Sequence, residues 1–463
     1  MNKLKNVVDG DFCTGCGACA YATNSSMTIN SYGEYIPILS DVGNSSAEIA
    51  EKVCPSLHPE LNETVLGKDL FKGYSNFSDK IGAYEQCFAG FVKEDTFRTN
   101  GTSGGFGTWV AAELLRLGKI DGVIHVKEAK RDGIESPFYK YQISETLTEL
   151  KSGSKTKYHV VELSEVLNEL RNKSGKYLFV GVPCLVKSLR RIQLVDKDVK
   201  DKIPYTIALV CGHFKSINWS LSLAWGKNIS PNNVSNIQYR TKGESIPARA
   251  YVFKAFNKNG SVIQENAGNV VGGKFNAGAL MVPACDFCDD VVGETADITI
   301  GDAWIPKYEV DDRGTNLLIV RNPELVKIIN AAHSEERVHV TEISGEEAIS
   351  SQSGGFRQRR DGLSYRLKKK KDAGLWFPEK RVEPGQFKLT KERERIYDSR
   401  SEVTSLSREK FKEALVAKDY SIYSVAMERK IKQLRFMEIK NSFFRLLFNK
   451  ISRVFLSTVK KVK

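Results

Sequence analysis

Residues 285–304 read CDFCDDVVGETADITIGDAW, and this stretch decides the fold because it joins a pair of cysteines to a strand. Cys285 and Cys288 have the spacing of a metal-binding knuckle. The β-prone run 296–300 then ends at Gly301 and Asp302, which places a polar side chain at the end of a strand. Asp302 is placed either to meet a ribityl or ribose hydroxyl or to cap a turn or helix.

Two other cysteines also follow apolar runs that read as strands. Cys184 comes after residues 177–180, and Cys211 comes after residues 205–210. Cysteines at two strand ends, together with the knuckle, can converge at one edge of a sheet and hold a second 4Fe-4S cluster. Spacing alone leaves open that each is a buried, small, apolar residue.

Residues 13–19 read CTGCGAC, which is the spacing that lets one loop hold three corners of a 4Fe-4S cluster. Gly15 and Gly17 allow the positive φ that such a loop needs. The Cys-Pro pair at 54–55 supplies a distant fourth thiolate. Zinc is the alternative, although zinc sites more often use paired knuckles than a triple. The predicted ligands are Cys13, Cys16, Cys19 and Cys54.

A glycine-rich turn, NGTSGGFG at residues 100–107, precedes an amphipathic helical pattern. Free N–H groups at the start of a helix suit a phosphate, but glycine turns before helices are often only turns. Lys155 and Lys157 place two cations on a second turn, which suits a phosphate or a solvated loop. No GxGxxG follows a strand, so the pattern of a standard dinucleotide fold is absent.

These motifs occur together in the order of a known family. The N-terminal motif, the turns at 103–105 and 153–155, the segments 181–184 and 211–212, and the block 285–304 resemble the beta subunit of coenzyme F420 (deazaflavin) hydrogenase/dehydrogenase. That family includes 7-hydroxymethyl chlorophyll a reductase and many bacterial members from surface-polysaccharide gene clusters. The resemblance covers roughly residues 10 to 350.

The resemblance implies an iron-sulfur flavoprotein oxidoreductase with FAD and two 4Fe-4S clusters. It implies that Cys184, Cys211, Cys285 and Cys288 hold the second cluster. The implied FAD contacts are Ser103, Gly104, Gly105, Ser154, Lys155, Pro183 and Asp302. Electrons would pass between a ferredoxin or other donor subunit and an organic substrate: the deazaflavin coenzyme or, in polysaccharide biosynthesis, a small or lipid-linked sugar. No proton donor is evident; His159 and His213 are candidates by position, and each also reads as a packed or solvated residue.

The basic character of the chain belongs to its last segment. Residues 361–463 hold 27 Lys and Arg against 13 Asp and Glu, whereas the first 360 residues are almost neutral. Residues 431–463 read as a basic amphipathic helix that fits an anionic membrane surface or the body of the protein; nucleic acid is not the expected partner. The apolar face consists of Phe444, Leu447, Phe448, Ile451, Val454, Phe455 and Val459.

We therefore predict a mixed α/β fold in three parts: a ferredoxin-like module over 1–70, a flavin and cluster domain over 80–350, and a basic linker with a helical tail over 355–463. The chain shows no secretory signal and no apolar run of spanning length, which predicts a cytoplasmic protein or one peripheral to the inner face of the membrane. The competing hypotheses are a non-enzymatic electron-transfer protein, a protein that metal merely stabilises, and a zinc-bearing nucleic-acid binder.

Overall fold

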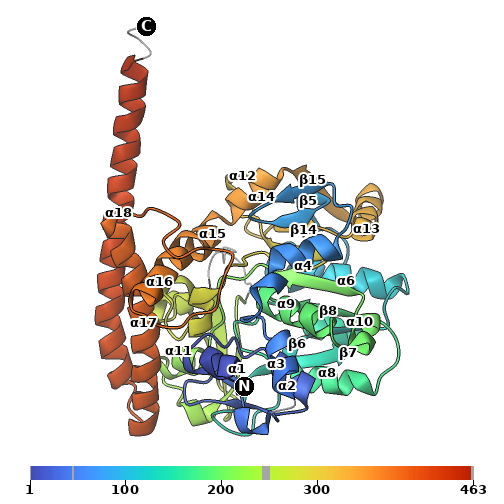
Figure 1. Cartoon of the computed structure of the whole chain (residues 1–463), viewed down its shortest axis with the longest axis horizontal. Helices are drawn as coiled ribbons and strands as arrows, with labels where there is room; N and C mark the ends of the chain where they lie inside the picture. The colour runs from blue at the N-terminus through green and yellow to red at the C-terminus, as the bar shows by residue number, and fades with distance from the viewer. Residues whose placement is uncertain (1, 44–45, 242–250, 460–463) are drawn as a thin grey trace.

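The computed structural model describes residues 2–43, 46–241 and 251–459; for residues 442–459 it describes the backbone only. The chain forms a mixed α/β body with a long helical hairpin along one side (Figure 1). Of the predicted tail helix, the residues of the proposed apolar face, Phe444 to Val459, therefore lie outside the described side chains.

An eight-stranded mixed sheet forms the centre of the body. Strands β13, β9, β8 and β6 run parallel to one another, and the outer strands join antiparallel. In spatial order the strands are β15 (Val338–Ile343), β5 (Gln86–Val92), β14 (Asn316–Val320), β13 (Ile298–Asp302), β9 (Tyr205–Leu209), β8 (Tyr177–Gly181), β6 (Gly122–Glu128) and β7 (Tyr139–Ser144). This sheet confirms the predicted mixed α/β fold.

Alternating side chains of the central strands serve two separate faces, as the period of two in a strand requires. On one face Val123, Leu178 and Ile207 pack with the helices α6 (Phe106–Arg116) and α13 (Pro323–Ser334). On the other face their neighbours Ile124, Phe179 and Ala208 join the core that contains α8 (Ser164–Arg171) and α9 (Pro183–Ile192). Because both faces are covered, the parallel strands are buried.

The N-terminal segment is a small unit of helices around a two-stranded hairpin. It consists of α1 (Asn2–Asp9), α2 (Ala18–Thr23), β1 (Met27–Ile29), β2 (Tyr35–Pro37) and α3 (Ala47–Val53), followed by α4 (Glu63–Leu70) and the hairpin β3 (Asn76–Ser78) and β4 (Gly82–Tyr84). Tyr21 and Val53 pack into the same apolar core as α8 and α9. The N-terminal unit is thus joined to the body by a shared core.

A second sheet and a group of helices complete the structure. The sheet consists of β10 (Val234–Gln238), β11 (Val252–Asn257) and β12 (Val262–Asn266), and α11 (Ile217–Trp225) packs beside it. The shorter helices of the body are α5 (Phe97–Asn100), α7 (Leu147–Ser152), α10 (Lys197–Lys202) and α12 (Pro306–Glu309). The C-terminal helices are α14 (Gly345–Ser351), α15 (Ser353–Arg359), α16 (Asp361–Asp372), α17 (Lys391–Ala417) and α18 (Ser421–Val459).

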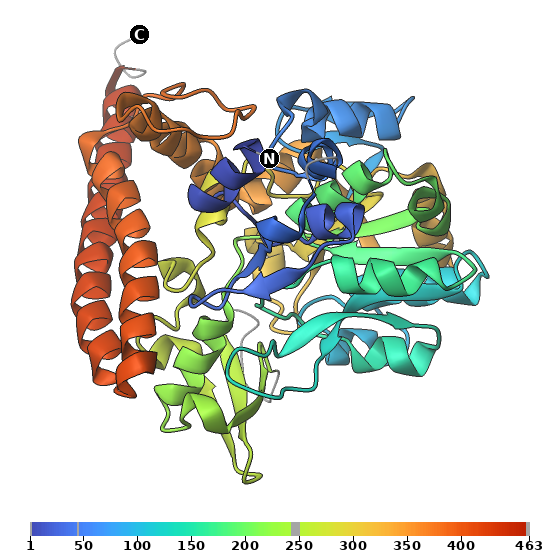
Figure 2. The ribbon, with the colours of Figure 1, turned by 60° about the horizontal axis from the view of Figure 1, so that its bottom comes forward.

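Helices α17 and α18 form an antiparallel hairpin, and α18 continues beyond it (Figure 1). Val403 and Phe411 of α17 are fully buried in the main core. Figure 2 shows the N-terminal unit lying between the sheet and this hairpin. The three-part division of the chain stays a prediction, although all three parts contribute to one core. Within the described residues, no helix has both the length and the apolar character needed to cross a membrane.

The contact between Arg408 of α17 and Glu34 of the N-terminal unit is a buried ion pair. Two nitrogens of the guanidinium each lie 2.9 Å from a carboxylate oxygen of Glu34. The two side chains are 9% and 7% exposed. We expect Arg408→Ala to destabilise the protein by about 3–5 kcal/mol, because it leaves the Glu34 carboxylate buried without a cation. Urea denaturation measures the change.

The control is Lys410→Ala, two residues along the same helix. Lys410 pairs with Glu413 at 2.7 Å on the exposed side, so its loss should change stability by no more than about 0.5 kcal/mol. Equal effects of the two substitutions would contradict a structural role for the Arg408–Glu34 pair.

Candidate functional site

A cavity of about 920 Å³ lies at the ends of the parallel strands β8, β9 and β13. Its volume is at the upper end of the range for small-molecule and cofactor sites. Among the predicted FAD contacts, five line the cavity: Ser103, Gly105, Ser154, Lys155 and Asp302. Gly104 and Pro183 are not among its lining residues. Gly104 packs on the sheet, where a Cβ would meet the Gly90 carbonyl oxygen at 2.7 Å, and Pro183 opens helix α9.

The glycine-rich turn opens a helix, as the sequence predicts. Gly105 lies at the N-cap of α6 with φ of 94°, in the left-handed region that favours glycine. The turn lines the cavity through residues Gly101, Thr102, Ser103 and Gly105. Gly107 and Thr108 of the first turn of α6 also line the cavity, ahead of the first intrahelical bond from Trp109 to Gly105, and an N-terminal turn of this kind favours an anion. The Phe106 N–H, by contrast, donates to Asn316 Oδ1 at 3.1 Å.

The second predicted turn lies beside the first one. The Thr102 and Thr156 hydroxyls are 2.9 Å apart, which joins the two turns. Lys157 is held by the Ser154 carbonyl oxygen at 2.8 Å and by that of Gly153. Burial, with the Lys155 charge, lowers the pKa of Lys157 to about 7. Lys157 therefore lines the cavity as a desolvated amine for which an anionic ligand would be a favourable partner.

Asp302 ends strand β13 as predicted, and its carboxylate accepts a hydrogen bond from Arg240 at 2.8 Å. Arg240 lines the cavity, and its guanidinium also reaches the Thr102 carbonyl oxygen at 3.4 Å. The pair therefore connects a strand end to the glycine-rich turn.

Four aromatic rings also line the cavity, and we call them the aromatic wall. Phe275 stacks on the His213 ring at 4.1 Å between centroids and lies 4.5 Å from the Tyr158 ring. Tyr251 is stacked parallel to Phe275 at 6.1 Å. All four rings line the cavity, so a flat apolar surface stands beside its polar turns. Such a surface suits a planar heteroaromatic ligand.

The structure brings the four cysteines of the predicted inner set together. Burial raises the pKa of Cys184 well above its usual range, and the neighbouring thiols of Cys211, Cys288 and Cys285 raise it further. Cys211 and Cys285 line the large cavity. Cys285 accepts a hydrogen bond from the Phe214 N–H at 3.2 Å. Four thiols from two strand ends and the knuckle therefore form one group, which we call the inner cysteine group.

The four N-terminal cysteines form an outer cysteine group in the same way. Cys13, Cys16, Cys19 and Cys54 all line a small cavity of about 20 Å³. Burial and the neighbouring Cys16 thiol raise the pKa of Cys54 to about 11.

The loop between these cysteines has the predicted backbone, since Gly15 and Gly17 have φ of 69° and 76°. An N–H of the loop points at sulfur, from Gly15 to Cys13 Sγ at 3.4 Å.

The two cysteine groups adjoin one another. A cavity of about 30 Å³ is lined by Cys184 and Cys288 of the inner group and by Thr14 and Pro55, which follow Cys13 and Cys54 of the outer group. The Cys16 thiol also contributes to the raised pKa of Cys184. Sequence spacing could not predict this adjacency, because it depends on how the N-terminal unit docks on α9.

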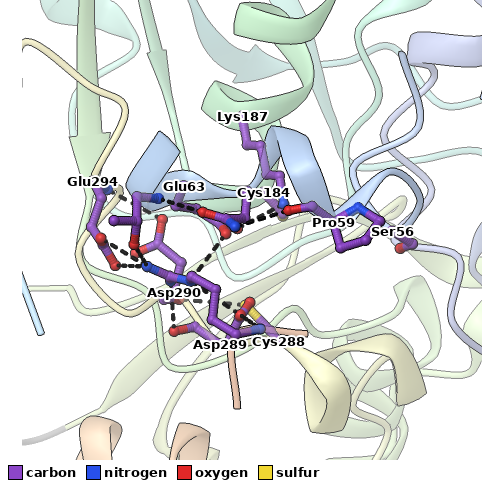
Figure 3. Close-up of polar contacts among 12 residues, drawn as sticks. Ser56, Pro59, Glu63, Cys184, Lys187, Cys288, Asp289, Asp290 and Glu294 are labelled. Carbon is purple, nitrogen blue, oxygen red and sulfur yellow. Dashed lines mark hydrogen bonds and ion pairs between the residues drawn. The ribbon is translucent and has the colours of Figure 1, made fainter. Parts of the chain in front are cut away.

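A buried ionic network lies next to Cys184 and Cys288 of the inner cysteine group (Figure 3). Lys187 and Glu63 form an ion pair at 3.0 Å, and Arg381 lies 2.9 Å from Glu294 and 3.3 Å from Asp289. Burial raises the pKa of Glu294 to about 7 despite the Arg381 charge. The network joins α4 and α9 to the loop after Cys288, so it fixes the position of that cysteine.

The donor set of each group fits a 4Fe-4S cluster: four buried or half-buried cysteines, with an N–H directed at sulfur in each group, from Gly15 to Cys13 and from Phe214 to Cys285. Within the described ranges, no three His, Cys, Asp or Glu side chains are arranged to hold a single metal ion. A cubane cluster is wider than one ion, so thiolates that hold it stand further apart than the ligands of zinc.

The two candidate proton donors are packed residues in this structure. His159 is 2% exposed and accepts a hydrogen bond from the Phe138 N–H at 3.1 Å. Burial lowers its pKa to about 3 and lowers that of His213 well below the usual range. Both rings line the cavity, and His213 Nε2 has no hydrogen-bond partner within the described part of the chain. A role for either residue in proton transfer stays a prediction.

Several residues at the site gave no signal in the sequence. Arg240, Tyr251 and Phe275 belong to no motif and reach the cavity only because the second sheet folds over it. Residues of the C-terminal extension, among them Arg357, Arg393 and Arg400, also line the cavity. Their basic character was visible, but nothing in the local pattern indicated that they fold back onto the site.

The structure thus places the inner cysteine group at the large cavity and the outer cysteine group next to the inner one. The chain belongs to the family of the coenzyme F420 hydrogenase/dehydrogenase beta subunit, whose N-terminal and C-terminal regions match residues 87–168 and 174–346. The resemblance predicted from the motifs is thereby confirmed, and it places the chain among oxidoreductase subunits that take part in electron transfer.

Among solved structures, the chain is similar to a chain of the F420-reducing NiFe hydrogenase complex from Methanosarcina barkeri, determined as a xenon derivative. The two are 19% identical, the match covers 64% of this chain and 96% of the other, and the TM-score is 0.48. No curated protein matches the sequence at a significant level.

The conformation of Gly105 can be tested by substitution. A Cβ at this position would lie 2.8 Å from the backbone nitrogen of Arg98, and the φ of Gly105 is positive. We expect Gly105→Ala to destabilise the protein by about 1–3 kcal/mol. Gly107→Ala is the control, because nothing lies within 4 Å of its Cβ position in α6; it should stabilise by about 0.5–1 kcal/mol. Thermal denaturation that shows equal losses in both variants would contradict the prediction.

The buried amine of Lys157 should make stability depend on pH. Above pH 7 the folded chain holds Lys157 deprotonated, whereas the unfolded chain keeps the proton up to about pH 10. The unfolded state then binds more protons, so the free energy of unfolding rises with pH between about 7 and 10. Lys157→Met should remove this increment. Parallel stability profiles of the two proteins, measured by urea denaturation from pH 6 to 10, would show that Lys157 titrates normally.

Proposed function

We propose that the protein is an FAD- and 4Fe-4S-dependent oxidoreductase of the F420 hydrogenase/dehydrogenase beta-subunit type. It passes electrons between a ferredoxin or other donor subunit and an organic substrate through an outer cluster, an inner cluster and FAD. The observation that carries the proposal is the continuous arrangement of the outer cysteine group, the inner cysteine group and the large cavity. Cys184 and Cys288 adjoin the outer loop, while Cys211 and Cys285 line the large cavity.

The polar end of the cavity supports FAD as its occupant. The start of α6, Lys155 and Lys157 provide N–H groups and cations for a pyrophosphate. The aromatic wall around Phe275 provides an apolar surface for the flavin ring system. When bound, a flavin exchanges two electrons with an organic substrate and single electrons with a cluster. The protein's part is to bind the phosphates, orient the ring next to Cys211 and Cys285, and exclude water.

Two arginines of the C-terminal extension support an anionic substrate. Arg357 and Arg393 line the cavity from α15 and α17, and the Arg393 Nε is buried without a hydrogen-bond partner in the described chain. Both residues lie beyond residue 346, where the family match ends. The deazaflavin coenzyme and a charged sugar or polysaccharide precursor both fit this requirement.

Location and membrane contact remain predictions. A cytoplasmic protein that meets the inner face of the membrane through its basic helix would encounter lipid-linked sugars there. The residues on which that contact depends, from Phe444 onward, lie outside the described side chains. Binding to vesicles that contain anionic lipid, compared between the full chain and a chain that ends at residue 441, tests the contact directly.

Metal and flavin analysis of anaerobically purified protein is the test of the proposed function. About eight irons and one FAD per chain would support two clusters and a flavin. About four irons with FAD would retain the enzyme and remove one cysteine group from the proposal. Zinc without flavin would overturn the redox function and favour a metal-stabilised protein.

Single substitutions should divide the iron between the two cysteine groups. Cys16→Ala should remove about half of the iron and spare the reduction of flavin by an artificial donor, since the outer group does not line the large cavity. Cys288→Ala should remove the other half and weaken flavin binding, because the inner group lies between the outer loop and the cavity. Cys87→Ala is the matched control, since Cys87 is buried in strand β5. Total loss of both cofactors in each variant would contradict two separate groups.

A further inference from the structure

Each cysteine group has one buried arginine that hydrogen-bonds the backbone of a ligand cysteine. Arg359 of α15 is 3% exposed, and its guanidinium donates to the carbonyl oxygens of Cys211 at 2.9 Å and Gly212 at 2.6 Å. Arg191 of α9 is fully buried and donates to the carbonyl oxygens of Cys54 at 2.5 Å and Leu57 at 2.6 Å. The two contacts correspond, although the two arginines belong to helices that are far apart in the sequence.

Neither arginine has a carboxylate partner within ion-pair distance in the described part of the chain. Three other buried arginines do have one, since Arg190 pairs with Asp297, Arg381 with Glu294, and Arg408 with Glu34. Arg321 is buried on carbonyl and hydroxyl oxygens instead. Arg359 also donates to the backbone carbonyl oxygen of Asp290 at 3.0 Å. The Asp290 carboxylate, however, accepts from the N–H groups of residues 292–294. A buried cation without a paired anion costs several kcal/mol, so an anion placed beside Arg359 or Arg191 would stabilise it.

The cysteine thiols would supply this negative charge once they bind metal. A coordinating thiol is deprotonated, and four thiolates give a 4Fe-4S cluster a net negative charge. The electrostatic neighbours of Arg359 are Cys288, Cys211 and Cys285, followed by Asp290. Those of Arg191 are Cys54, then Glu63 and Glu60, then Cys16.

Resting on the proposed function, we infer that Arg359 and Arg191 are the counter-cations of the inner and outer clusters and that each raises the reduction potential of its own cluster. A reduced cluster carries one more negative charge than the oxidised one, so a nearby fixed cation stabilises the reduced form. Arg359 lies outside the region that matches the family, which ends at residue 346. The C-terminal extension thereby sets the potential of the inner cluster, the one that adjoins the cavity.

The experiment is an EPR-monitored redox titration of anaerobically purified full-length variants. Arg359→Gln should lower the midpoint potential of the inner cluster by about 59 mV or more, equal to a tenfold change in the ratio of reduced to oxidised cluster. It should leave the outer cluster unchanged. Arg191→Gln should do the reverse. The charge-conserving substitutions Arg359→Lys and Arg191→Lys should keep most of each potential, and the Cys16→Ala and Cys288→Ala variants assign the two signals.

Arg321→Gln is the matched control for a purely structural effect. Arg321 is 1% exposed and donates to the carbonyl oxygens of Ala296 and Ile81, without a contact to a cysteine carbonyl. It should lower the thermal stability as much as Arg359→Gln does and shift neither potential by a comparable amount. Clusters that are present at full iron content and do not shift in Arg359→Gln, or that shift equally in Arg321→Gln, overturn the inference alone. Wild-type protein without iron overturns the proposed function together with it.

Discussion

The parallel pairing of β8, β9 and β13 is the constraint on which the rest of the structure depends. Parallel strands end at the same edge of a sheet, so the residues that follow them meet in space however far apart they lie in the sequence. Cys184 follows β8, Cys211 follows β9, and Asp302 ends β13. Both faces of these strands are covered by helices, which leaves their ends as the place where the sheet can present side chains to a ligand. The inner cysteine group and the large cavity are therefore consequences of one pairing pattern.

This dependence explains which features could be predicted from the sequence. Strands that end at a cysteine, a glycine turn before an amphipathic helix, and the loop at 13–19 are local patterns, and the structure has each of them at or near the predicted residues. Gly104 shows the limit of a motif. It belongs to the same turn as Gly105 but is required for close packing on strand β5 rather than for a surface in the cavity. The sequence pattern records that glycine is needed at both positions and cannot distinguish the two reasons.

The contacts between distant segments could not be predicted, because no local period encodes them. Arg359 reaches the carbonyl group of Cys211 across 148 positions of sequence, and Arg408 reaches Glu34 across 374. In the sequence both arginines belong to a generally basic tail, for which a solvated surface or a membrane contact is the ordinary interpretation. In the structure they are buried and have defined partners. The net charge of the segment therefore predicted exposed arginines, which is wrong for Arg359 and Arg408, since both pack against the body.

Burying these arginines has a physical consequence for the order in which the protein is assembled. An arginine such as Arg408 is compensated by a carboxylate as soon as the chain folds, so its burial needs nothing else. Arg359 and Arg191 are surrounded by carbonyl groups and thiols, which solvate a cation but do not neutralise it. If the proposed clusters form, their thiolates would make this burial more favourable. Stability of the C-terminal extension and loading of the inner cysteine group would then be coupled, because the same guanidinium belongs to helix α15 and to the electrostatic environment of Cys211, Cys285 and Cys288.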